Sequence, residues 1–562
     1  MRGFWARSRP DNTRQGTRDA MRRLPVIAGL VLVVVTAILS SVSADWRALW
    51  PPLAALLVIL AVRRALVGLL VGGYAGAVLL VGGDPWQAYL AVFADHLAPS
   101  LASPWKVGAI AFTLVLGGFA AVLDAGGGFA ALMRRLAAPG RDARRRFQLA
   151  AVGLGLLCFF DGLANSMMVG RVGRGLADRC GVARVKLAYI VDSTSSAVAC
   201  VALVSTWIAY QLTMIEEGFR IAGLEVNPYA AFLRSLPYNF HSWFTLVLVA
   251  AAAVWNYAPG PMAGFERAAR ARASTAAAAQ DPRPGRAWSA LVPLAALLLA
   301  FVVGFLVLGS PGPIWPPTRQ GMVAAFGSDA GPLVMVLAGL VGTLVAAATV
   351  GGPLAGRVGR TARAFTAGVR TMLGPILVLI AAWILGSVMQ SLGTADLIAG
   401  LVRTVDSGAF VPVATFLTGA LVSFASGTSW GTMGLLFPLA IPAAAAVTGG
   451  GDAPLAATVA AVFSGAVFGD HCSPFSDTTI VTSIACEVEP HDHVRTQIPY
   501  ALVTAAVAAL VGFVPAGLGV APGWSLLSGA AILIALARWR GDRTLRAGAR
   551  SPASSGSDVR GG

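Results

Sequence analysis

Long apolar segments alternate with short polar or arginine-rich segments along almost the whole chain. An uncharged apolar segment of about 18 residues or more is long enough to cross a bilayer as a helix. The pattern therefore predicts an all-α polytopic membrane protein with about 12 transmembrane helices. The expected spans are residues 24–43, 47–62, 65–82, 107–124, 187–215, 241–259, 288–309, 329–350, 374–391, 454–486, 497–517 and 523–537.

Composition supports a membrane protein and excludes several other classes. The chain is 56% hydrophobic and only 12% charged, whereas soluble domains carry about 25% charged residues. The net charge of +16 comes from arginines in the connecting segments and tails, where they set topology, so no nucleic-acid patch is expected. The five cysteines show no disulfide or zinc spacing. The partners expected are the lipid bilayer and a small transported solute, and no cofactor is expected.

Arginine placement predicts the orientation of the chain. The basic tails 1–23 and 538–562 are expected on the cytoplasmic side of a bacterial plasma (inner) membrane. An apolar segment after a basic start also resembles a signal peptide, and 42–44 resembles a cleavage site. Segment 24–43 is long for a signal peptide, so an uncleaved first helix is expected.

Two segments do not fit as simple spans. The loops on both sides of 147–170 are rich in arginine, and the positive-inside rule places such loops in the cytoplasm. This segment is therefore expected to enter and leave on the cytoplasmic side. The alternative is that one of the two loops violates the rule. If the basic C-terminal tail is cytoplasmic, the spans that precede it place both ends of segment 409–447 on the outside. We therefore expect two re-entrant hairpins, with tips near Asn165 and Thr428, which must be surrounded by protein or line a cavity.

A long helix broken near an aspartate follows each hairpin. Helix 187–215 is expected to break around Asp192, and helix 454–486 around Pro474, which lacks a backbone donor. The arrangement predicts two repeats of inverted topology, residues 24–259 and 288–537, joined by a cytoplasmic linker at 260–287. Inverted repeats whose broken helices meet at the midplane are typical of secondary transporters.

Polar residues at these breaks are the candidate binding residues, because charged groups at membrane depth are costly and usually mark a transport path. They are Asp161, Asn165, Asp192, Ser193, Thr194, Ser426, Thr428, Ser429, Asp470, His471, Ser473, Ser476, Asp477, Thr478 and Thr479. Hard oxygen ligands suit Na⁺, for which Asp192, Asp470 and Asp477 are the expected carboxylate ligands. An aspartate in low dielectric also binds a proton more readily. Competition between Na⁺ and H⁺ at one carboxylate is the simplest antiport mechanism.

Structural roles are open for several of these residues. Asp161 could cap a hairpin turn, and Asp192 could be a helix N-cap. The run 426–432 could be a tight turn, and His471 could be a hydrogen-bonded core residue. Residues 491–493, with two histidines, are expected in a solvated loop rather than at a metal site.

No enzymatic activity is expected. The chain has no Walker A or HExxH motif. Residues 427–431 match the GxSxG motif of serine hydrolases letter by letter. That motif requires a strand, a turn and a helix in a soluble α/β fold, whereas here the flanking segments are expected to be membrane helices.

Two motifs, FASGTSWGT at 424–432 and GDHCSPFSDTT at 469–479, resemble the paired motifs of NhaC-type Na⁺/H⁺ antiporters of the ion transporter superfamily. The resemblance extends over roughly residues 50–520. It implies inverted repeats, re-entrant hairpins and elevator-type alternating access, often in a homodimer. The resemblance implies binding roles for Asp192, Ser426, Thr428, Asp470, Ser473, Ser476, Asp477 and Thr478. Residues 161–170 depart from the best-known members, and relatives include carriers of organic acids and amino acids.

The leading hypothesis is secondary Na⁺/H⁺ antiport. The alternative is Na⁺-coupled symport or exchange of a small organic acid or amino acid, which the abundance of hydroxyl and amide groups at the hairpin tips favours. A passive channel is a third class, against which the broken, aspartate-bearing helices argue. Stoichiometry, cation selectivity and oligomeric state do not follow from the sequence.

Overall fold

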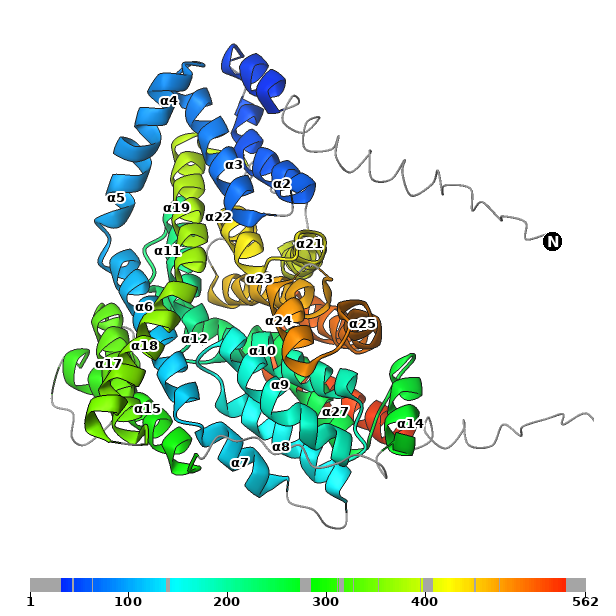
Figure 1. Cartoon of the computed structure of the whole chain (residues 1–562). Coiled ribbons are helices and arrows are strands. Elements are labelled where there is room, and N and C mark those ends of the chain that lie inside the picture. The colour runs from blue at the N-terminus through cyan, green and yellow to red at the C-terminus, as the bar shows by residue number, and fades with distance from the viewer. Residues whose placement is uncertain are drawn as a thin grey trace, which may run out of the picture.

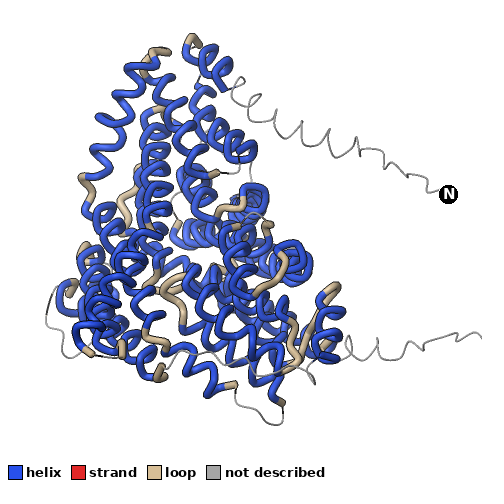
Figure 2. Tube along the Cα trace, in the orientation of Figure 1, coloured by secondary structure: helices blue, strands red, loops and turns tan. Residues whose placement is uncertain are grey.

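A computed structural model describes residues 32–541, except 43–44, 63, 138–141, 273–284, 311, 313–317, 327, 352, 395, 398–407, 449–450 and 475. Within these residues the protein consists of helices and loops and contains no strand (Figure 2). The all-α fold expected from the sequence is confirmed.

The helices before the predicted linker begin with η1 (Asp45–Leu49), α2 (Trp50–Val62), α3 (Ala65–Leu80), α4 (Pro85–Ala91), η2 (Val92–Leu97), α5 (Ala98–Leu101), α6 (Pro104–Ala125) and α7 (Gly128–Leu136). They continue with α8 (Ala143–Leu157), α9 (Gly162–Arg179), α10 (Arg184–Val201), α11 (Thr206–Ile221), α12 (Pro228–Ser235), η3 (Leu236–Tyr238) and α13 (Phe240–Val254). Within the predicted linker 260–287 the chain forms α14 (Met262–Arg272).

The helices after the linker are α15 (Trp288–Leu308), α16 (Arg319–Phe326), α17 (Gly331–Thr349), α18 (Leu354–Thr371), α19 (Leu373–Ser391), η4 (Gly408–Phe410), α21 (Val411–Ser426) and α22 (Ser429–Thr448). They end with α23 (Asp452–Cys472), α24 (Asp477–Cys486), α25 (Pro490–Val507), η5 (Ala508–Phe513), α26 (Val514–Gly517) and α27 (Pro522–Arg540).

The number of membrane spans is close to the expected number. Nine helices in the described residues are long and apolar enough to cross a membrane, or up to 11 if each bent helix pair is one span. The sequence predicts about 12. Residues 24–31 and 43 of the first expected span, 24–43, lie outside the described residues, and the span expected at 241–259 is the shorter helix α13.

The breaks expected from the sequence are present, but one lies elsewhere. Helices α23 and α24 are separated by residues 473–476, as Pro474 predicts. The break expected at Asp192 lies instead after Val201, where α10 and α11 meet at 46°. Ser205 caps α11, whereas Asp192 lies inside α10, where Gln497 and Thr479 of other helices donate to one of its carboxylate oxygens.

Both predicted hairpins are pairs of helices joined by short turns. Helices α8 and α9 are joined by residues 158–161, so the turn lies one helical turn before Asn165. Helices α21 and α22 are joined at Gly427 and Thr428. Gly427 has a φ of 70°, a left-handed conformation that glycine adopts without steric cost.

The helices that carry these breaks lie in the middle of the molecule. In Figure 1, α21 to α25 (yellow to orange) lie between α2 and α3 above and α8 to α10 below. Helices α15, α17 and α18 gather beside α6 at one side. Helix α21 packs very closely on α23, where the backbones of Gly419 and Gly465 are in contact.

Candidate functional site

A cavity of about 390 Å³ lies where four helices begin. The first residues or caps of α9, α11, α22 and α24 all line it, namely Asp161, Thr206, Thr428 with Ser429, and Asp477. The remaining polar lining comes from Arg64, Ser426, Asp470 and Thr478, and two tryptophans, Trp207 and Trp430, also line the cavity. The two hairpin turns, the break at 473–476 and the break between α10 and α11 therefore meet at one cavity, whereas Asp192, where the sequence predicts the second break, does not line it.

Side chains cap three of these four helix starts, that of α11 through Ser205 and those of α9 and α22 through residues that line the cavity. Asp161 accepts a hydrogen bond of 2.6 Å from the backbone N–H of Ala164, and Thr206 donates one of 2.8 Å to Asp161. Thr428 accepts from the N–H of Gly431 at 3.1 Å. Asp161 thus caps α9, the structural role left open by the sequence, and also lines the cavity. Four helix N-termini give the cavity wall a partial positive charge.

Asp470 is the most constrained carboxylate of the cavity. It lies in the last turn of α23 and is 3% exposed. Ser476 donates to its Oδ1 at 2.6 Å, and Ser196 of α10 donates to its Oδ2 at 2.8 Å. Its backbone oxygen accepts from the hydroxyls of Thr478 and Thr479, each at 3.2 Å. The chain after the break thus folds back on Asp470 and surrounds it with hydroxyl groups.

Asp477 and Ser426 are the less constrained polar groups of the wall. Asp477 is the first residue of α24 and is exposed to the cavity. Ser426 ends α21 and is buried, and its Oγ has no hydrogen-bond partner among the described residues. A bound solute could therefore use both groups without displacing an existing contact.

A second polar cluster lies behind the cavity wall, around Asp192. Gln497 donates to Asp192 Oδ2 at 2.7 Å and Thr479 donates at 3.4 Å, while His493 Nε2 lies 3.3 Å from the same oxygen. Asp192 Oδ1 has no hydrogen-bond partner in the described part of the chain. Gln497 also donates to the backbone oxygen of His471. Asp192, Thr479, His493 and Gln497 all lie outside the cavity lining, so the expected carboxylates divide between two neighbouring clusters.

Other residues predicted for the binding site make hydrogen bonds within and between helices. Asn165 is buried and donates to the backbone oxygens of Gly155 and Thr194 at 3.1 and 2.9 Å, so it joins α9 to α8 and α10. Thr194 donates to backbone oxygens of its own helix. His471 Nε2 lies 2.8 Å from Ser193 Oγ, which agrees with a hydrogen-bonded core residue. Ser473 is buried at the start of the break.

His493 corrects an expectation from the sequence. Residues 491–493 were expected in a solvated loop, but α25 begins at Pro490 and His493 is fully buried against Asp192. His493 and Gln497 are four residues apart, so both lie on the helix face that packs toward Asp192. His491 is exposed. In the sequence, only the four-residue spacing of His493 and Gln497 could have indicated which of the two histidines is buried.

Further residues of the site were missed in the sequence. Arg64, Thr206, Trp207 and Trp430 line the cavity, and Ser196 holds Asp470. Ser196 belongs to the hydroxyl-rich run after Asp192, but nothing in the sequence distinguished it from its neighbours. Arg64 was assigned to a short basic loop between two spans.

The structure offers few acidic or soft ligands for a metal. Among the described residues no group of three or more His, Cys, Asp or Glu side chains could hold a metal ion, and all five cysteines are free. A Na⁺ ion carried as substrate would therefore take most of its ligands from hydroxyl and carbonyl oxygens, which hard cations accept.

Known proteins that are similar to this chain include membrane transporters. Over 479 residues the chain is 29% identical to an uncharacterized protein of Haemophilus influenzae, covering 83% of this chain and 90% of that protein. It is 36% identical over 143 residues to the malate-2H⁺/Na⁺-lactate antiporter of Bacillus subtilis, which is 25% of this chain and 28% of that protein. The crystal structure of the Alcanivorax borkumensis YdaH transporter has a similar fold, with a TM-score of 0.55 and 16% identity over 78% of this chain and 89% of that one.

The sequence profile of the Na⁺/H⁺ antiporter family matches residues 198–518, which include α21 to α25 and the two motifs at the cavity. The NhaC-type resemblance of these motifs is confirmed. Because the match covers more than half of the chain, the protein belongs to the Na⁺/H⁺ antiporter family.

Proposed function

We propose that the protein is a secondary active transporter of the bacterial plasma membrane that exchanges Na⁺ for H⁺. The observation that carries the proposal is the buried carboxylate of Asp470, which lies at a helix break and borders a cavity between apolar helices. A charged carboxylate at membrane depth is costly unless a positive charge accompanies it. Asp470 is therefore placed to bind either a cation or a proton.

Exchange follows if the two ions exclude one another. A proton on Asp470 removes the negative charge that attracts Na⁺, and Na⁺ near Asp470 disfavours the proton. Hydroxyl oxygens of Ser196, Ser476 and Thr478 surround the carboxylate and can supply further ligands. In this proposal the repeats 24–259 and 288–537 expose the cavity alternately to the two sides, with both termini in the cytoplasm.

Na⁺-coupled symport or exchange of a small organic acid or amino acid is a second candidate function. The cavity of about 390 Å³ is far larger than a bare ion requires and falls within the usual range for small-molecule sites, roughly 300–1,000 Å³. Four helix N-termini and Arg64 give it groups that attract a carboxylate. The malate and lactate named for the Bacillus subtilis relative belong to this chemical class.

The first test uses everted membrane vesicles with a preset pH gradient reported by a fluorescent dye. Added Na⁺ should dissipate the gradient in vesicles that contain the protein, but not in vesicles that contain the Asp470→Asn variant. If no monovalent cation dissipates the gradient at any pH, Na⁺/H⁺ antiport is rejected.

The second test separates the two candidates in proteoliposomes. Labelled Na⁺ flux that requires a dicarboxylate, a monocarboxylate or an amino acid would favour the organic substrate over simple antiport. Na⁺ flux that depends only on the pH gradient would favour antiport. Stepwise single-channel currents would contradict both.

A further inference from the structure

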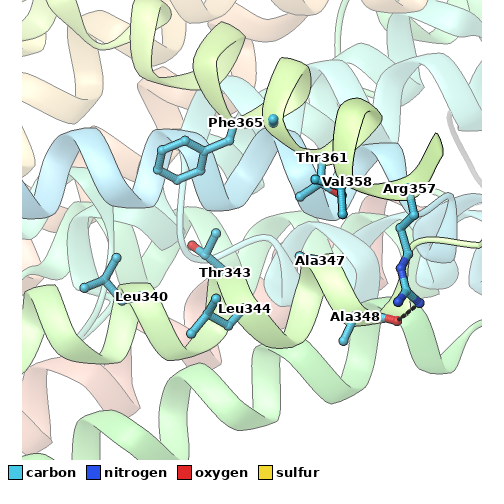
Figure 3. Close-up of a pocket in the computed structure, with 10 residues that line it drawn as sticks. Leu340, Thr343, Leu344, Ala347, Ala348, Arg357, Val358, Thr361 and Phe365 are labelled. Atoms are coloured by element: carbon cyan, nitrogen blue, oxygen red, sulfur yellow. Dashed lines mark hydrogen bonds between the residues drawn. The ribbon is translucent and has the colours of Figure 1, made fainter. Parts of the chain in front are cut away.

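A groove of about 460 Å³ runs between α17 and α18, away from the candidate functional site. Figure 3 shows Leu340, Thr343 and Leu344 of α17 on one side, facing Val358, Thr361 and Phe365 of α18 on the other. Arg357 lies at one end of the groove, where its guanidinium donates to the backbone oxygen of Ala348 at 3.4 Å.

The groove is apolar and open. Leu344 is 70% exposed and Val358 is 60% exposed. The Oγ1 atom of Thr361 is buried and has no hydrogen-bond partner among the described residues. Because α17 is long and apolar enough to span a membrane, this surface would be covered by hydrocarbon chains rather than water.

Charge distinguishes the groove from an ordinary lipid-facing surface. Helix α18 carries Arg357, Arg360, Arg363 and Arg370, and neither α17 nor α18 contains an acidic residue. The arginines at 351–370 are also the reason that this segment is expected on the cytoplasmic side. Anionic lipids attract basic residues that lie at the surface of that leaflet.

We propose that the α17–α18 groove binds an anionic phospholipid of the cytoplasmic leaflet. One acyl chain lies along Leu340, Leu344 and Phe365, and the phosphate lies at the end marked by Arg357, within reach of Arg360 one turn further along. A guanidinium binds phosphate through parallel N–H donors, so arginine is suited to this contact.

The position of the groove gives the lipid a route to influence transport. Helix α18 ends at Thr371, and the next residues, Met372, Gly374 and Pro375, line the candidate substrate cavity. Phe365 of α18 also packs closely on Gly118 of α6. The proposal concerns lipid binding and is independent of which solute the protein carries.

The experiment measures lipid retention by the purified full-length protein in native mass spectrometry. Phosphatidylglycerol and phosphatidylcholine with the same acyl chains are supplied in equal amounts. The wild-type protein should retain phosphatidylglycerol preferentially. Retention should fall roughly tenfold or more in Arg357→Gln/Arg360→Gln, since two basic contacts to an anionic headgroup are lost.

The matched control is Arg363→Gln/Arg370→Gln, which makes the same change of charge on the same helix. Arg357 lines the groove and Arg360 donates to the backbone oxygen of Gly351 in the connection between α17 and α18, whereas Arg363 and Arg370 lie further along α18 and outside the lining. The control variant should retain phosphatidylglycerol like the wild type. Thr361→Phe, which fills the groove without changing charge, should reduce retention as well.

Several results would overturn the proposal. They are equal retention of the two lipids by the wild type, unchanged retention in Arg357→Gln/Arg360→Gln, and equal binding of free glycerol phosphate without acyl chains. Cross-linking of two copies through a cysteine placed at Leu344, with lipid excluded, would assign the groove to a second copy of the chain.

Discussion

Ser196 of α10 donates a hydrogen bond of 2.8 Å to Asp470 of α23, although 274 residues separate them in the chain. The bond joins the helix that bears Asp192 to the helix that bears Asp470, the proposed ion-binding carboxylate. Thr479, which donates to Asp192 and to the backbone oxygen of Asp470, connects the second polar cluster with the cavity in one network. The network links regions that the sequence assigns to two different repeats.

The carboxylates of the cavity wall should be essential for transport. We expect Asp470→Asn and Asp477→Asn to reduce Na⁺-dependent proton flux to the level of empty membranes, because neither amide can carry a proton or neutralise a cation. Asp95→Asn, at an exposed position on η2, is the matched control and should keep wild-type flux. Membrane insertion is checked by the amount of full-length protein in the vesicles. Wild-type rates in both site variants would remove the proposed site.

His493 should matter far more than His491. His493→Gln removes the imidazole 3.3 Å from the buried carboxylate of Asp192, and a partner lost from a buried polar group costs about 1–3 kcal/mol. We expect a lower thermal unfolding temperature in detergent together with reduced transport. His491→Gln changes the same residue type two positions away at an exposed site and should leave both unchanged. Equal effects of the two changes would contradict the buried Asp192 cluster.

A buried ion pair should respond asymmetrically to loss of its partners. Lys106 Nζ of α6 lies 3.2 Å from Glu217 of α11, and Arg220 also pairs with Glu217. Glu217→Gln leaves the buried ammonium without an ion-pair partner in the described residues and should cost about 3–5 kcal/mol. Lys106→Met should cost less, because Glu217 keeps Arg220. Thermal stability measured by size-exclusion chromatography after heating would show the order, and the reverse order would count against this reading.

Close packing next to the site should not tolerate even one methyl group. Gly469 precedes Asp470, and a Cβ there would overlap the backbone of Ser423 in α21. We expect Gly469→Ala to destabilise the protein by about 1–3 kcal/mol, because backbone atoms cannot move aside as a side chain can. Gly153→Ala, on helix α8, is the control, since nothing lies within 4 Å of its Cβ, and it should be neutral or slightly stabilising. An unfolding temperature for Gly469→Ala at or above that of Gly153→Ala would contradict the packing argument.

Several polar residues of the cavity lining could be predicted from the sequence, but others could not. Asp161, Ser426, Thr428, Asp470 and Asp477 stand out as polar residues within apolar flanks, and all of them line the cavity. Arg64, Thr206 and Gln497 do not stand out, because each lies where a loop or a helix end gives an ordinary reason for a polar residue. The break expected at Asp192 illustrates the same limit, since a hydroxyl-rich run after an aspartate suits both an N-cap and a buried network.

The sequence by itself determined the all-α membrane class, the hydrophobic spans, the break at Pro474 and the family motifs. These features depend on local composition, on the length of a bilayer-spanning helix and on the missing backbone donor of proline. Only the tertiary structure decided which breaks share a cavity, which histidine is buried, and that Asp192 belongs to a second cluster behind Asp470. Those outcomes depend on contacts between helices hundreds of residues apart, such as that of Ser196 with Asp470, and helical periodicity gives no information about which faces meet.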